Sequence, residues 1–313
     1  MPPRFFIVGH PKCGTTALYE MLKAHPQVFM PALKEPHFFA RESHERGRPS
    51  RRLPTTLEQY LALFAGARAG QRTGEASTSY LRSPAAAARI AELCTDAQIV
   101  AILREPAGFL RSLHLQLLQS GVETEPDLAT AMGLEEARRS AAAGERGSFW
   151  RQALLYSQQV RYVEQLRSYA QRFGRERLLV LVYDDFRADN ERTARDVLRF
   201  IGVDDTVALE HAQANPTVRV RDSKASEAVR AVTIGRGPLA RETKALVKSV
   251  VPRPVRRGAV RTLTRTLVKR KPPPADEVLM AELRRRFTGQ VQAASEYLQR
   301  DLVSLWGYDA SHT

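Results

Sequence analysis

The chain has 313 residues, of which 43% are hydrophobic and 26% are charged, which is typical of a globular protein that buries a core without disulfides or a structural metal. Its two cysteines, Cys13 and Cys94, are too few for a secreted disulfide framework or a four-cysteine zinc site, so we expect a reducing, cytoplasmic location. The opening residues lack the pattern of a signal peptide, and no apolar run is long enough to cross a membrane.

The net charge of +14 is concentrated in one stretch of the sequence. Residues 219–271 hold 16 of the 48 Lys and Arg residues but only three of the 34 acidic residues. The rest of the chain is close to neutral, so the sequence does not indicate a basic surface that covers the whole protein.

Short apolar runs, each followed by residues at helical spacing, recur along the first two thirds of the chain. Strands are expected at residues 4–9, 71–76, 98–103 and 178–183. Helices are expected at residues 17–23, 84–93, 107–118, 148–172, 188–201 and 276–302. Apolar strands that alternate with helices predict an α/β fold, with a mostly parallel sheet flanked by helices.

Charge and proline distribution predict three segments. We expect residues 1–215 to form the α/β core, residues 216–274 a basic, helical insertion or lid, and residues 275–313 a C-terminal helix that packs back on the core. Prolines divide the basic segment, and helices are expected there at residues 239–251 and 255–268.

The stretch GHPKCGTT, residues 9–16, joins the first expected strand to the first expected helix. In such a loop, backbone N–H groups and the positive end of the helix attract an anion, Lys12 adds a charge, and Thr15 and Thr16 offer hydroxyl donors. The loop of nucleotide triphosphatases needs a Gly-Lys pair, which this sequence lacks, so ATP or GTP hydrolysis is disfavoured. A glycine turn that only connects strand and helix stays open as the alternative.

Two further polar clusters follow expected strands, one after Thr73 and one after Leu103. Ligands of parallel sheets bind beyond the carboxyl ends of the strands. We therefore expect three clusters that are distant in sequence to converge on one crevice.

Four segments carry the strongest pattern in the sequence. They are FIVGHPKCGTTALYEML around the loop, Lys34-Glu-Pro-His-Phe-Phe39, Gly74-Glu-Ala-Ser-Thr-Ser-Tyr80, and Arg104-Glu-Pro106 with Ser112 eight residues after the arginine. In type and order they resemble motifs of the sulfotransferases that use 3′-phosphoadenosine-5′-phosphosulfate (PAPS), in the branch of bacterial enzymes and heparan sulfate sulfotransferases. The resemblance covers residues 5–203 and implies the P-loop-like sulfotransferase fold, built on a strand, a phosphate loop and a helix.

The resemblance also implies an activity and its residues. It implies transfer of a sulfuryl group from PAPS to a hydroxyl of a sugar, lipid or secondary-metabolite acceptor, with release of adenosine 3′,5′-bisphosphate (PAP). Lys12 would stabilise the bridging oxygen that leaves sulfur, and Glu75 would be the general base. The implied nucleotide contacts are Cys13, Gly14, Thr15 and Thr16 at the 5′-phosphate, Arg104 and Ser112 at the 3′-phosphate, and Tyr156 elsewhere on the nucleotide. No metal is implied.

Some positions depart from the family pattern or stay open. An arginine common in the fourth motif is Phe109 here, and the proline of the third motif is Thr78. Histidine ordinarily titrates near neutrality, so His10 and His37 are alternative bases, although packing and hydrogen bonding are the favoured roles. Contact of Lys34 with the acceptor stays open.

Two rival functions remain at the level of sequence. One is a phosphoryl transferase that uses the same loop, although no carboxylate pair for magnesium is evident. The other is a nucleic-acid or membrane-docking protein that acts through Arg253–Lys271, which has eight basic residues and no acidic one. This stretch could lie on a membrane surface, form a wall for an acidic acceptor, or be a solvated face. We expect a hydroxyl-bearing acceptor, no nucleic acid, and peripheral membrane contact only through that stretch.

Overall fold

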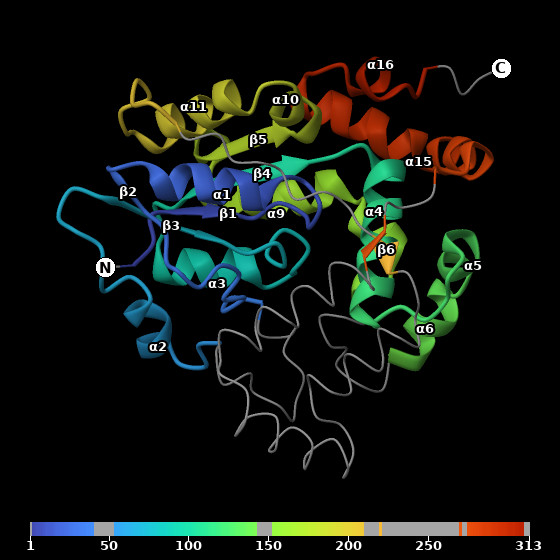
Figure 1. Ribbon diagram of the computed structural model, residues 1–313, viewed down its shortest axis with the longest axis horizontal. Helices are drawn as coiled ribbons and strands as arrows, with labels where there is room; N and C mark the ends of the chain where they lie inside the picture. Colours follow the sequence, from blue (N-terminus) through green and yellow to red (C-terminus); the bar gives the residue numbers. More distant parts are fainter. Residues whose placement is uncertain are drawn as a thin grey trace, which may run out of the picture. The chain divides into compact units, whose positions relative to one another are not determined.

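The main sheet of the computed structural model is parallel and has five strands (Figure 1). The structure describes residues 2–40, 53–142, 152–209, 219–220, 269–270 and 274–309. The strands are β1 (Phe5–Ile7), β2 (Val28–Phe29), β3 (Arg72–Ala76), β4 (Gln98–Leu103) and β5 (Leu178–Val182). Their order across the sheet is β2-β3-β1-β4-β5, and every neighbouring pair is parallel. The predicted α/β class is confirmed.

Strand β1 is the middle strand, with β3 on one side and β4 on the other. Phe6 of β1 is paired with Glu75 of β3 and with Ile99 of β4. Because the three strands are parallel, the segments that follow them leave the sheet at the same edge. The loop after β1 therefore lies between the segments after β3 and β4, as the three polar clusters require.

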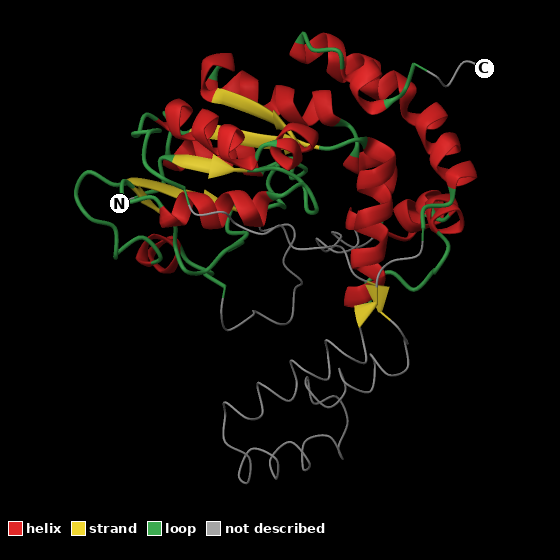
Figure 2. Ribbon diagram, turned by 45° about the horizontal axis from the view of Figure 1, so that its top comes forward, coloured by secondary structure: helices red, strands yellow, loops and turns green. Residues whose placement is uncertain are grey.

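Helices cover both faces of the sheet (Figure 2). They are α1 (Thr15–Ala24), α2 (Leu57–Ala62), α3 (Ala86–Leu93), α4 (Pro106–Ser120), α5 (Leu128–Gly133), α6 (Glu135–Ala142), α8 (Tyr156–Gln159), α9 (Tyr162–Phe173), α10 (Tyr183–Ala188), α11 (Asn190–Ile201), α15 (Glu277–Leu298) and α16 (Leu302–Trp306). Helix α1 packs against α11, whereas α9 packs against α3, α15 and strands β4 and β5. The crossover through α1 runs from β1 toward β2 and the one through α3 runs the opposite way, so right-handed connections place these helices on opposite faces.

One predicted helix is divided in the structure, and two others correspond to single helices. The helix expected at residues 148–172 is wrong as a continuous element, because Arg161 has φ −77° and ψ 57° between α8 and α9. Before this break, the amide group of Gln159 donates to the carbonyls of Gln152 and Leu155. The helix expected at residues 188–201 corresponds to α11, which Asp189 caps, and the helix expected at residues 276–302 corresponds to α15, which ends at Gln299 with φ 50°.

The chain divides into two compact units. One comprises residues 1–113, 127–215 and 276–313, and the other residues 114–126 and 216–275. In the first unit, α15 packs against α9. In the second unit, β6 (Arg219–Val220) pairs antiparallel with β7 (Lys269–Arg270), while the helices predicted at residues 239–251 and 255–268 lie outside the described residues.

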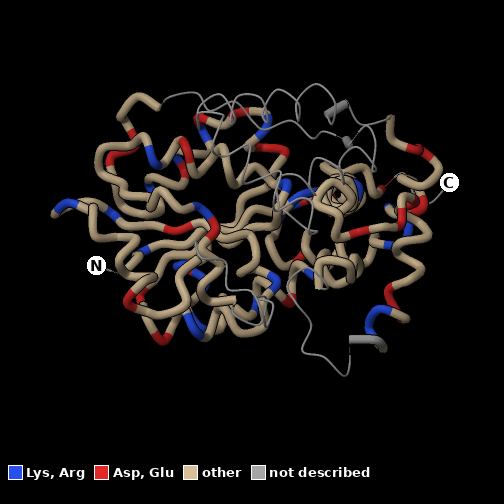
Figure 3. Tube along the Cα trace, turned by 60° about the horizontal axis from the view of Figure 1, so that its bottom comes forward, with Lys and Arg blue, Asp and Glu red and all other residues tan. Residues whose placement is uncertain are grey.

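Acidic and basic residues are interspersed along the part of the chain that the structure describes (Figure 3). This pattern agrees with the near-neutral charge of the sequence outside residues 219–271. Among the described helices, none combines the length and the apolar character needed to cross a bilayer.

Candidate active site

The loop of residues 9–16 passes directly from β1 into α1 and depends on glycine at two positions. Gly14 has φ 82°, and a Cβ there would lie 2.8 Å from the ring of Phe186. A Cβ at Gly9 would lie 2.9 Å from the backbone nitrogen of Ile102 in β4. The loop is therefore packed tightly against β4 and α10, and its backbone fits only because these two side chains are absent.

Lys12 and Arg104 lie together although 92 residues separate them in the sequence. A guanidinium nitrogen of Arg104 donates to the carbonyl of Lys12 at 2.9 Å. Burial and the nearby charge of Arg104 lower the pKa of Lys12 from its ordinary value. The guanidinium also lies over the ring of Tyr183, 4.7 Å from its centre. Two cations at a phosphate-type loop make a site for an anion with more than one negative group.

The backbone around Arg104 is fixed by three side chains. The hydroxyl of Tyr162 donates to the carbonyl of Arg104 at 2.7 Å. Glu105 accepts the amides of Ala107 and Gly108 at the start of α4, at 2.8 and 2.5 Å. The hydroxyl of Tyr308, near the C-terminus, donates to the same carboxylate at 2.7 Å. These contacts therefore fix the backbone of Arg104, from which its side chain extends.

The other predicted loop residues differ in how accessible they are. Cys13 has no exposed surface, and burial raises its pKa to about 12, so it is a packing residue in its thiol form. Thr15 begins α1 and is 4% exposed, whereas Thr16 and Gly14 are partly exposed. Ser112 lies on α4 and is 4% exposed. Gly14, Thr15 and Thr16 follow β1, and Ser112 lies in the helix that follows β4.

His10 is part of the core rather than an accessible base. Its Nε2 lies 2.8 Å from Oε1 of Gln165, and its ring contacts the rings of Phe109 and Tyr162. Burial lowers the pKa of His10 to about 3, so the ring is neutral at physiological pH. Phe109, which stands where the family commonly has arginine, is one wall of this packing.

Glu75, the predicted base, is completely buried in β3. Its carboxylate accepts hydrogen bonds from Tyr60 at 2.6 Å, Ser77 at 2.5 Å and Tyr80 at 3.1 Å. Burial raises the pKa of Glu75 to about 7, although the three hydroxyls lower it in part. A carboxylate with this pKa is suited to act as a base. The hydroxyl groups that donate to it, however, all belong to the protein and not to an acceptor.

A second carboxylate, Glu35, lies near this group and was not singled out from the sequence. Its side chain is 35% exposed, with an oxygen 2.6 Å from Nζ of Lys34 and the other 3.5 Å from Nε2 of His37. Its amide donates to the carbonyl of Ala76 at 3.0 Å, which joins the segment to the end of β3. The sequence did offer a signal for Glu35, because this acidic residue lies between Lys34 and His37, two residues already considered for roles near the acceptor.

Tyr156 begins α8 and has no exposed surface, so its predicted contact with the nucleotide stays a prediction. Gln159, at the other end of α8, accepts a hydrogen bond from Arg82 at 3.1 Å.

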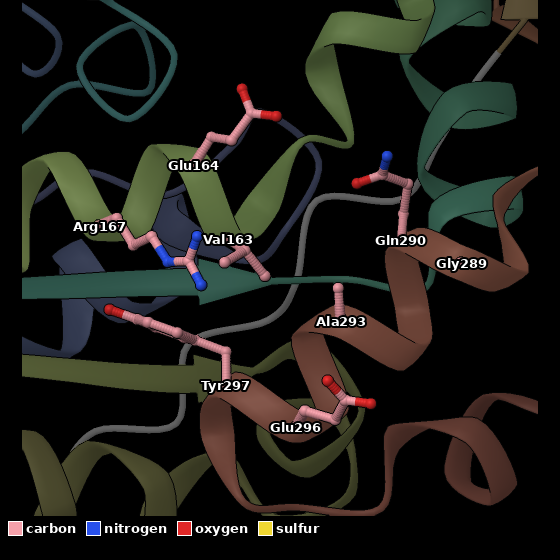
Figure 4. A pocket seen from close by; sticks show the side chains of 8 residues that line it. All are labelled: Val163, Glu164, Arg167, Gly289, Gln290, Ala293, Glu296 and Tyr297. Atoms are coloured by element: carbon pink, nitrogen blue, oxygen red, sulfur yellow. The ribbon is translucent and has the colours of Figure 1, made fainter.

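A cavity of about 500 Å³ lies elsewhere, between α9 and α15 (Figure 4). Its lining comes only from these two helices and is formed by Val163, Glu164, Arg167, Gly289, Gln290, Ala293, Glu296 and Tyr297. None of the predicted site residues is in this set. The cavity is therefore separate from the loop and its two cations.

The sequence profile of the sulfotransferase family matches residues 3–206. The chain is 28% identical over 215 residues to mouse heparan sulfate glucosamine 3-O-sulfotransferase 3B1, an alignment of 69% of this chain and 50% of that protein. It is 47% identical over 64 residues to human carbohydrate sulfotransferase 15, which is 20% of this chain and 11% of that protein. The chain thus spans half or less of the length of these relatives.

A sulfotransferase from Alicyclobacillus acidocaldarius has a similar crystal structure, with a TM-score of 0.67 and 25% identity, and the match covers 98% of this chain and 99% of that one. The chain belongs to the sulfotransferase family and is related to the heparan sulfate sulfotransferases.

Proposed function

We propose that the protein transfers a sulfuryl group from PAPS to a hydroxyl of an acceptor and releases PAP. The observation that carries this proposal is the placement of Arg104 against the backbone of Lys12 at the loop after β1. A nucleotide with phosphates at both its 5′ and 3′ positions needs two cationic groups on one side of a sheet. ATP offers no 3′-phosphate for the second of them.

Each residue of the site has a role that follows from its chemistry. Lys12 meets the negative charge that develops on the bridging oxygen as the S–O bond breaks. The loop amides at Cys13 and Gly14, with Thr15 and Thr16, hold the 5′-phosphate. Arg104 donates to the 3′-phosphate in a fork, with the hydroxyl of Ser112 beside it. These donors supply the positive field, so we expect transfer without a metal and no loss of activity in EDTA.

We propose Glu35 as the general base in place of Glu75. A base must come within hydrogen-bond distance of the acceptor hydroxyl, and Glu35 has exposed carboxylate surface next to Lys34 and His37. Glu75 has no exposed surface and already accepts hydrogen bonds from three hydroxyl groups. Lys34 can then orient the carboxylate or the acceptor, which gives this lysine a place on the acceptor side.

A sugar hydroxyl is the first acceptor to test, because several relatives are named for carbohydrate or heparan sulfate substrates. Lipid alcohols and secondary metabolites are the further classes that a screen should include. Transfer of radioactive sulfate from PAPS to desulfated heparan, chondroitin and an extract of lipids would separate these classes.

The binding part of the proposal can be tested without an acceptor. We expect calorimetry to show binding of PAP that is at least tenfold tighter than binding of AMP, and no comparable binding of ATP with magnesium. Lys12→Ala and Arg104→Ala should each weaken PAP binding by tenfold or more. Lys23→Ala and Arg161→Ala, which change exposed cations elsewhere, are the matched controls. Equal affinity for PAP and AMP would contradict the proposed role of Arg104.

The assignment of the base has its own test. Glu35→Gln should retain PAP affinity and lower the transfer rate by at least a hundredfold, within the range of general-base catalysis. Transfer by Glu35→Gln at close to the wild-type rate would contradict the assignment to this carboxylate.

A further inference from the structure

The segment that carries Glu35 is held by alternate backbone amides, all bonded to the end of β3 and the residues after it. The amide of Glu35 donates to the carbonyl of Ala76 at 3.0 Å. The amide of His37 donates to Oγ of Ser77 at 3.1 Å. The amide of Phe39 donates to the hydroxyl of Tyr80 at 3.3 Å. Two of these three acceptors are therefore side-chain hydroxyls.

Both hydroxyls donate hydrogen bonds to one buried carboxylate, that of Glu75. Ser77 donates to Glu75 at 2.5 Å and Tyr80 donates to it at 3.1 Å. A hydroxyl has one proton and can accept only through the lone pairs that remain. Because Glu75 accepts both of these hydrogen bonds, the hydroxyl oxygens of Ser77 and Tyr80 present their lone pairs to the amides of His37 and Phe39.

The backbone of this segment needs such support. Glu35 has φ 59° and His37 has φ 52°, so two residues with side chains adopt the left-handed region within three positions. This conformation is unfavourable for residues other than glycine and persists where surrounding contacts impose it. The side chain of His37 adds one more contact, since its Nδ1 lies 2.7 Å from Oγ of Ser79.

We propose that Glu75 is a positioning residue, which acts through Ser77 and Tyr80 to hold the segment of residues 34–39 in the conformation that presents Glu35. This inference rests on the proposed function, and it gives the buried carboxylate a part in catalysis that needs no contact with the acceptor.

Two tyrosines provide a matched pair of variants for the test. Tyr60 and Tyr80 both donate to Glu75, but only the Tyr80 hydroxyl also accepts an amide of the 34–39 segment. Tyr80→Phe and Tyr60→Phe each remove one hydroxyl from the carboxylate and keep the ring. Ser77→Ala removes the other accepting hydroxyl, and Ser77→Thr restores one.

The first readout is hydrogen exchange of peptides that cover residues 34–40, which needs no acceptor. We expect exchange at least tenfold faster in Tyr80→Phe and Ser77→Ala, and unchanged in Tyr60→Phe and Ser77→Thr. PAP affinity measured by calorimetry should be the same in all four variants, which shows that the nucleotide site is intact.

The second readout is catalysis. In Tyr80→Phe and Ser77→Ala we expect kcat for sulfate transfer from PAPS to fall at least tenfold, while KM for PAPS changes by less than twofold. Equal exchange rates in Tyr80→Phe and Tyr60→Phe would overturn the inference. A wild-type protein that binds no PAP would instead contradict the proposed function and leave the exchange comparison valid.

Discussion

Glu75 and Glu35 lie in two segments that are hydrogen-bonded to each other, but their carboxylates have opposite surroundings. Glu75 is fully buried with three hydroxyl donors, whereas Glu35 is partly exposed beside a lysine and a histidine. Exposure decides which of them can meet an acceptor, and burial decides which of them can serve as a fixed internal anchor. The same burial has a consequence for stability that can be measured.

The raised pKa of Glu75 predicts a pH-dependent stability. The pKa is about 7 in the folded protein, against an ordinary value of 4.5. Between these values the folded state binds a proton that the unfolded state does not, so the free energy of unfolding falls as pH rises, by roughly 3 kcal/mol in total. We expect urea unfolding at pH 5 and pH 8 to show this loss in the wild type and to show it reduced in Glu75→Gln. The same pH difference in both proteins would contradict the raised pKa.

Gly14→Ala tests the loop at the level of one methyl group. The added Cβ would meet the ring of Phe186 at 2.8 Å and would impose φ 82° on alanine, so we expect a loss of stability of about 2 kcal/mol and weaker PAP binding. Gly202→Ala is the control, because Gly202 also has positive φ but its added Cβ meets nothing within 4 Å. That variant should lose about 1 kcal/mol and keep its PAP affinity. Urea unfolding and calorimetry measure the two effects.

At the scale of elements, the C-terminal segment supports the strand end that carries Arg104. Tyr308 is fully buried, and its hydroxyl donates to Glu105, which also caps the start of α4. We expect Tyr308→Phe to lower the free energy of unfolding by about 2 kcal/mol, because the hydrogen bond is to a charged group, and to weaken PAP binding. Tyr297→Phe is the control, since the Tyr297 hydroxyl is buried with no hydrogen-bond partner among the described residues. Equal destabilisation of the two variants would show that the Glu105 contact is unimportant.

The sheet and the main motifs could be predicted from the sequence because their signals are local. The apolar run at residues 98–103 coincides with β4, and the glycine-containing loop lies between β1 and α1. The break at Arg161 was missed, because the apolar residues keep their helical spacing across it. Strand β2 has two residues and is too short to show alternation.

The site was predictable to a different degree. Lys12 and Arg104 belong to motifs that can be recognised in the sequence, and parallel strands carry them to one edge. The role of Glu35 depends on positive φ values and on hydroxyl contacts with residues 76–80, which sequence spacing does not reveal. The surroundings of Glu75 could not be foreseen either, because its hydrogen-bond donor Tyr60 lies in α2, which was not predicted.

At the scale of the whole molecule, charge is divided between a near-neutral body and the basic residues of the stretch 219–271. The cations of the proposed nucleotide site, Lys12 and Arg104, lie outside that stretch of the sequence. Replacement of Arg256, Arg257, Arg261 and Arg265 by Gln should therefore leave PAP affinity within about twofold of the wild type at constant salt. Sedimentation with anionic vesicles would show whether the same change removes membrane contact. A large loss of PAP affinity would contradict the separation of the two charged regions.

Both thiols of the protein are shielded. Cys13, inside the loop, has no exposed surface and Cys94 is 4% exposed, and burial raises their pKa values to about 12 and about 11. Thiolate is the form that reacts with oxidants and alkylating reagents, and it is scarce at neutral pH for both residues. Turnover should therefore persist in hydrogen peroxide or iodoacetamide, and a cysteine introduced at a chosen surface position would carry a fluorescent label without interference from the native pair.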